Sequence, residues 1–156
     1  HDQITARICV EYFTIGHQPI SDFAIDDPTI LGLIWGVIAT WWVGVLLGVP
    51  LAFVSRFGPG PKRTVSFLVP RMMKLALLAF ILAILSGLVG YVAASLGWIH
   101  LTGRMAVEVP PEKHVAFLVD LWAHNASYAT GFLGGLDLCV HVWRQRATSV
   151  SHGDVS

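Results

Sequence analysis

Two long apolar runs without charge constrain the fold of this chain more than any other feature. Ile30 to Val54 and Leu75 to Ile99 each extend over 25 residues without Asp, Glu, Lys or Arg. As helices they would be about 37 Å long, and the hydrocarbon core of a bilayer is about 30 Å thick. Helices of soluble domains keep a polar face, which neither run has. We therefore expect two transmembrane helices, and Asp27-Pro28 supplies a helix start just before the first.

A third segment, His114 to Trp143, is expected to form another span although polar residues interrupt it. Its middle part, Leu121 to Leu136, is free of charge. The composition agrees, because 54% of the 156 residues are apolar and only 13% are charged, about half the share in soluble domains. The expected fold class is all-α, a polytopic transmembrane helical bundle with three spans in this chain. An upstream hydrophobic segment, either a fourth span or a cleaved signal, is expected before His1.

The distribution of basic residues predicts how the spans are oriented. The 55–74 loop contains five Lys or Arg and no acid, and two Arg follow the third span in the 144–156 tail. Short loops rich in Lys and Arg stay in the cytoplasm. The 1–29 segment has one Arg and five acids, so we expect it outside the bacterial inner membrane, together with the 100–113 loop. Ten Lys or Arg balance ten Asp or Glu over the chain, which predicts no nucleic-acid partner.

Small residues recur along one face of each predicted span. In lipid, close backbone approach along such faces drives helix association. We expect these faces to pack helices together, within the chain or against another subunit, although glycine is common in membrane helices generally. The second span carries Ala83, Gly87 and Gly90 among others, and the expected packing positions of the first and third are Gly32, Gly36, Thr40, Gly44, Gly48, Gly131 and Gly135.

Two Asp-x-x-x-His pairs interrupt the third span, namely Asp120 with His124 and Asp137 with His141. The four-residue spacing places each pair on one helical face, where it could hold a metal ion or transfer a proton. About 25 Å of helix separates the two pairs, so each could instead sit at a membrane surface. This interfacial interpretation is favoured for Asp137 and His141, whereas both interpretations stay open for Asp120 and His124.

The outer segment contributes further metal-capable residues, because His1, Asp2, Glu11 and His17 all lie there. Glu11 and His17 with Asp120 and His124 would supply two carboxylates and two imidazoles, a set that suits iron, manganese or zinc. Their spacing matches no specific metal signature.

The alternative for this segment is an amphipathic surface helix, which we favour. It would carry an i,i+4 ion pair between Arg7 and Glu11. A bis-histidine haem is disfavoured, because the first two spans contain no His.

Three motifs mark the first third of the chain: His-Asp-Gln-x-Thr from His1, Glu-Tyr-Phe-Thr from Glu11, and Trp-Gly-Val-Ile-Ala-Thr-Trp-Trp from Trp35. In these motifs the chain resembles a group of small bacterial multi-span membrane proteins to which no activity is attached. The resemblance implies four spans, the first of which ends at the His-Asp-Gln motif. It implies no mechanism.

The sequence supports three functional hypotheses and assigns no catalytic residue. The first is a structural or accessory subunit of a membrane assembly, whose partners are the lipid bilayer and other subunits or further copies of this chain. The second is a membrane metal-binding or redox enzyme with an outer-surface site built from Glu11, His17, Asp120 and His124. The third is a small proton-linked transporter that uses Asp120 and His124.

Overall fold

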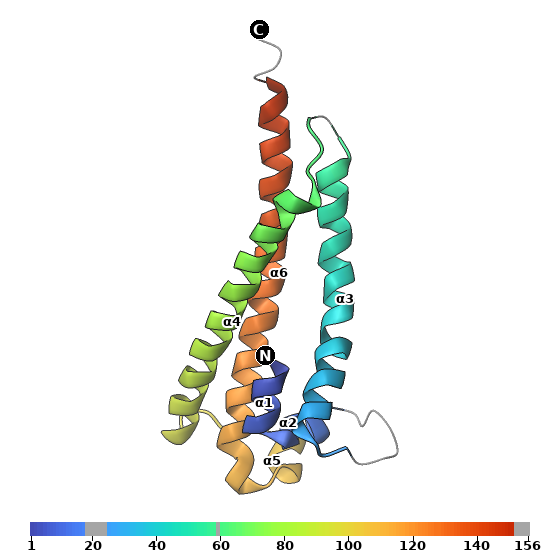
Figure 1. Ribbon diagram of the computed structural model, residues 1–156. Coiled ribbons are helices and arrows are strands. Elements are labelled where there is room, and N and C mark those ends of the chain that lie inside the picture. The colour runs from blue at the N-terminus through green and yellow to red at the C-terminus, as the bar shows by residue number, and fades with distance from the viewer. Residues whose placement is uncertain (18–24, 59, 152–156) are drawn as a thin grey trace. The chain divides into compact units, whose positions relative to one another are not determined.

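The computed structural model describes residues 1–17, 25–58 and 60–151, and this part of the chain is helical without a strand (Figure 1). The all-α fold class is therefore confirmed. In chain order the elements are α1 (Asp2–Ile8), α2 (Val10–Thr14), α3 (Pro28–Arg56), α4 (Val65–Ser95), α5 (Arg104–Glu108), the short 3-10 helix η1 (Pro111–Lys113) and α6 (His114–Ser151).

The contacts divide the chain into two compact units, and each is considered alone. The first unit contains His1–Thr40 and Phe80–Ser127, and the second contains Trp41–Ala79 and Tyr128–Ser156. Two helices of the described chain, α3 and α4, are long and apolar enough to cross a membrane. They correspond to the two uncharged runs of the sequence.

The start of α3 and the end of α4 follow from local capping chemistry. The Asp27 carboxylate accepts hydrogen bonds from the backbone N–H groups of Thr29 and Ile30, both at 2.9 Å, and so caps α3. Gly97, with a φ of +71°, follows the end of α4. There the N–H of Trp98 bonds to the carbonyl of Ala93 at 2.9 Å, the pattern of a glycine C-cap.

Helix α4 begins at Val65, ten residues before the apolar run. The segment expected as a basic loop over 55–74 is a loop only over 57–64, since α3 ends at Arg56. Lys and Arg are good helix formers, so charge marks the end of the apolar run and not the end of the helix. Arg71 is accommodated within α4, because it donates to the Phe67 carbonyl at 2.7 Å and lies over the Phe67 ring.

The N-terminal segment forms two short helices rather than one continuous amphipathic helix. Cys9 separates them with extended backbone angles, φ −147° and ψ 100°. The break removes the expected i,i+4 pair of Arg7 with Glu11. Arg7 instead donates to the hydroxyl of Thr29 at 2.9 Å, and Glu11 pairs with Lys113 at 3.5 Å.

The first unit has a hydrophobic core beneath these two helices. Its buried members come from α1, α2, α3, α6 and the segment between α4 and α6: Ala6, Cys9, Tyr12, Phe13, Leu31, Leu101, Val109, Phe117 and Leu118. Figure 1 shows α1 and α2 beside the first half of α6. The N-terminal segment is thus packed into the first unit.

Glycines allow close helix contacts at some of the expected positions. A Cβ added to Gly90 of α4 would lie 2.9 Å from Cγ of Trp122 on α6, and one added to Gly32 of α3 would lie 2.9 Å from the Asp2 carbonyl oxygen. In the second unit, a Cβ on Gly135 would meet Leu47 at 2.8 Å. In contrast, a Cβ at Gly44, Gly48 or Gly131 would have no described atom within 4 Å beyond its own helix and chain neighbours.

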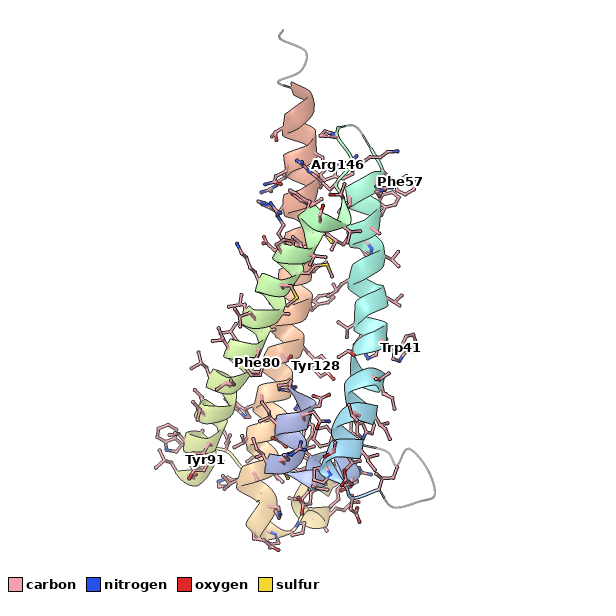
Figure 2. All side chains as sticks on the ribbon, in the orientation of Figure 1. Trp41, Phe57, Phe80, Tyr91, Tyr128 and Arg146 are labelled. Atoms are coloured by element: carbon pink, nitrogen blue, oxygen red, sulfur yellow. The ribbon has the colours of Figure 1, made fainter. Side chains whose placement is uncertain are left out.

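Arg146 of α6 organises the end of α3 in the second unit (Figure 2). Its side chain is buried, with 2% exposure. The guanidinium donates to five backbone carbonyls, those of Val54, Phe57, Gly58, Gly60 and Pro61, at 2.5 to 3.2 Å. Four of these residues lie in the loop after α3. Helix α6 continues to Ser151, and residues 152–156 of the predicted tail lie outside the described chain.

Candidate metal centre

A cluster of three metal-capable side chains lies in the first unit, formed by His1 and Asp2 at the start of α1 and His124 of α6. One ligand atom from each lies within 4.8 Å of the others. The Oδ1 atom of Asp2 is 2.9 Å from Nδ1 of His1 and 3.2 Å from Nε2 of His124. The carboxylate therefore lies between two imidazoles.

Close packing of α1 against α3 places Asp2 at this position. Gly32 has no side chain, which leaves room for the backbone of Asp2 and the side chain of Gln3. The amide nitrogen of Gln3 donates to the Thr29 carbonyl at 2.9 Å and holds α1 at the start of α3. A residue with a Cβ at position 32 would displace α1 and, with it, the Asp2 carboxylate.

The orientation of His124 matches that of metal-binding histidines. Its Nδ1 lies 2.8 Å from the backbone carbonyl oxygen of Asp120. A carbonyl only accepts hydrogen bonds, so Nδ1 carries a proton. In a neutral imidazole Nε2 then presents a lone pair, and here Nε2 points at the Asp2 carboxylate. Two lone pairs facing each other at 3.2 Å require either a proton between the two atoms, carried by His124 or by Asp2, or a cation.

Asp120 adds a buried carboxylate to the same region. The residue has 0% exposure, and neither carboxylate oxygen has a hydrogen-bond partner in the described chain. It lies one turn before His124 and interacts electrostatically with Asp2. Burial of an unpaired carboxylate costs several kcal/mol, and a bound cation is one way to offset that cost. When both are ionised, Asp120 and Asp2 together would provide two negative charges for such an ion.

Glu11 and His17, the other two expected ligands, have different partners. Glu11 pairs with Lys113 and accepts a hydrogen bond from the Cys9 thiol at 3.4 Å. Burial opposes the ionisation of Glu11, but hydrogen bonds and the Lys113 charge outweigh it and hold its pKa below the ordinary value. His17 donates from Nδ1 to the Tyr12 carbonyl at 2.8 Å, and its ring lies against Trp35.

The structure thus groups Asp120 and His124 with His1 and Asp2, and gives Glu11 and His17 roles in packing. His1 and Asp2 were metal-capable by type, but no spacing in the sequence selects them over Glu11 and His17. Asp137 and His141, the second pair on α6, are exposed.

The chain matches no protein-family model, no curated protein and no solved structure. The chemistry of the cluster therefore has to be inferred from its own residues. Two imidazole nitrogens and two carboxylate groups in one region form a donor set for a divalent transition-metal ion.

Proposed function

We propose that this protein is an integral membrane protein that binds a divalent transition-metal ion through His1, Asp2 and His124, with Asp120 as the fourth ligand. One observation carries the proposal. The proton on Nδ1 of His124 leaves Nε2 directed at the Asp2 carboxylate, 3.2 Å away, beside a second buried carboxylate that has no hydrogen-bond partner. A cation among these groups would lie between the facing lone pairs of His124 and Asp2 and would compensate the charge of the buried Asp120 carboxylate.

The donor set favours zinc, manganese or iron(II). Imidazole suits zinc and iron, whereas carboxylate oxygen suits manganese as well. Metal–ligand bonds of 2.0 to 2.2 Å in tetrahedral geometry separate neighbouring ligand atoms by about 3.3 Å. The observed separations of 2.9 and 3.2 Å around Asp2 are close to this value, so small side-chain shifts suffice to seat an ion.

The membrane part of the proposal is supported by the apolar surface of α3 and α4. In the most apolar window of each helix, only 11% and 17% of the residues are buried within the protein. A core helix of a soluble protein would be mostly buried, so this surface needs another apolar environment. Lipid supplies it. We propose α6 as the third span, with Asp120 and His124 facing the protein interior, and the N-terminal segment outside the bacterial inner membrane.

Metal analysis of protein purified from its native membrane tests the proposal. We expect one metal ion per chain, and we expect single alanine substitutions of His1, Asp2, Asp120 and His124 each to lower the metal content strongly, because each removes a ligand. His17→Ala and Glu11→Gln are the matched controls, and both should keep the ion.

The two rival hypotheses predict different results in the same experiment. A structural or accessory subunit would contain no stoichiometric metal and would tolerate all six substitutions with its assembly intact. A proton-linked transporter would also lack the metal, but Asp120→Asn would abolish a pH-dependent activity in a correctly folded protein. Either result would contradict the metal centre.

A further inference from the structure

An apolar pocket in the first unit adjoins the metal-capable cluster. Its volume is about 610 Å³, within the usual range of sites for small organic ligands. Helices α1, α4 and α6 form its walls, with Ile4 and Ile8 of α1, Ile84 and Leu88 of α4, and Val119 of α6 among the lining residues. His1 lines the pocket as well, and its Nδ1 is also 2.9 Å from Asp2 Oδ1. The cluster and the pocket therefore share a side chain.

The side chains of the pocket restrict the charge of a ligand. No Lys or Arg is among the described residues that line it, and its only acid is Glu112. The lining residues supply no counter-charge for an anionic head group, Glu112 would repel one, and the two carboxylates of the cluster would balance the charge of a bound divalent ion. Hydroxyl groups, in contrast, can pair with His1 and Thr5. The remaining lining is almost entirely apolar. This combination fits a neutral molecule with a hydroxyl group and an apolar chain.

Access to the pocket follows from the apolar character of α4. This helix is one of the two that can cross a membrane, and Ile84 and Leu88 are exposed on its surface, at 47% and 58%. In a bilayer these side chains would border lipid. A lipid-soluble molecule could then enter from the hydrocarbon region without passing through water.

We propose that the pocket binds a neutral lipid that carries a hydroxyl head group and an apolar chain, with the hydroxyl directed towards His1. A contact between this hydroxyl and a bound ion rests on the proposed metal centre, because a hydroxyl oxygen can coordinate a divalent ion. The apolar lining of the pocket does not depend on the ion.

Photolabelling tests this proposal. Purified full-length protein in lipid nanodiscs is exposed to a long-chain alcohol that carries a diazirine in its chain, and labelled residues are mapped by mass spectrometry. We expect labelling at the pocket walls that excess unlabelled alcohol removes and that a fatty acid of the same length does not. Labelling that does not saturate, or that the fatty acid removes equally well, would overturn the proposal.

Two tryptophan substitutions on α4 provide a matched pair. Ile84→Trp fills the pocket and should lower saturable labelling about tenfold, which corresponds to about 1.4 kcal/mol of steric cost. Leu85→Trp adds the same bulk at an exposed position that does not line the pocket, and it should leave labelling unchanged. Equal effects of the two substitutions would contradict the assignment of the site.

Metal content measured on the same samples separates this proposal from the metal centre. Saturable, Ile84-dependent labelling in protein without metal would support the lipid pocket and contradict the metal centre. Stoichiometric metal without saturable labelling would support the metal centre and contradict the lipid pocket.

Discussion

Cys9 lies within the core of the first unit, but the protonation state of its thiol makes it a poor metal ligand. Burial raises the pKa of its thiol to about 12, and the negative charges of Glu11 and Asp120 add to the effect. The thiolate is the form of cysteine that binds metals, so this side chain stays protonated and inert at neutral pH. The cluster is thereby left with imidazole and carboxylate ligands.

We expect Cys9 to react slowly with iodoacetamide at pH 8 in the folded protein and rapidly after denaturation, because only the thiolate attacks. The measurement is the labelling rate by mass spectrometry in a Cys139→Ala background. The raised pKa also means that folding favours the protonated thiol. The free energy of unfolding should be insensitive to this group below pH 9, the ordinary pKa of the thiol, and should fall as the pH rises towards 12. Equal labelling rates in the folded and denatured protein would contradict this assignment.

At the scale of the helices, a glycine is important for packing where another element approaches it closely. Its place in a regular row of small residues does not by itself give it this role. Gly90 faces Trp122 at contact distance, and Ser86, one turn before it, donates to the Trp122 carbonyl at 3.0 Å. Gly44 belongs to the regular row of small residues on α3, yet a Cβ there would meet no described atom within 4 Å beyond its own helix and chain neighbours. The sequence row alone does not distinguish these two environments.

We therefore expect Gly90→Leu to destabilise the protein by about 1–3 kcal/mol, because the new side chain forces α4 away from Trp122. Gly44→Leu is the control and should be neutral or slightly stabilising, since glycine weakens a helix. Thermal unfolding in one detergent, followed by circular dichroism, compares the two variants. If Gly44→Leu is instead the more damaging change, its face is covered by a partner.

Arg146 is also important for the stability of the helices, because its one guanidinium donates hydrogen bonds to five carbonyl groups near the end of α3. Arg146→Met should cost about 2–4 kcal/mol, since it leaves several carbonyls without their charged donor. Arg144→Met changes an exposed residue of the same helix and should cost little. Proteolysis within the 57–64 loop, measured for both variants, should accelerate only in Arg146→Met.

For the whole molecule, the sequence predicted the long helices, and it singled out two of the four metal-capable residues that the structure groups together. Uncharged runs identify α3 and α4, because no other described element contains so many apolar residues without a charge. Asp120 and His124 were identifiable because polar residues are conspicuous in an apolar helix. The proximity of these two residues to His1 and Asp2 was not predictable. It depends on the break between helices α1 and α2 at Cys9, and on the close approach of α1 to α3 at Gly32. Both features arise from packing between segments that are distant in the sequence, so no residue spacing in the sequence indicates them.

The orientation in the membrane is the remaining prediction at this scale, and it depends on charge. If α4 crosses the bilayer, the 57–64 loop before it and the segment after it lie on opposite sides. The basic residues around the first loop should keep it in the cytoplasm. In a protein whose Cys9 and Cys139 are replaced by Ala, we introduce cysteine at Lys62 or at Thr102, both of which are exposed. Gly60 is a poorer position, because its φ is +92° and its carbonyl binds Arg146.

A membrane-impermeant maleimide added to intact cells should label Thr102→Cys. It should label Lys62→Cys only after the cells are lysed, because the reagent cannot cross the bilayer to reach a cytoplasmic loop. Labelling of Lys62→Cys from outside, with Thr102→Cys protected, would reverse the orientation and place His1, Asp2 and His124 towards the cytoplasm. Labelling of both positions from outside would show that α4 does not cross the membrane. The proposed entry of a lipid along Ile84 and Leu88 would then fail as well, because these side chains would no longer border the hydrocarbon region.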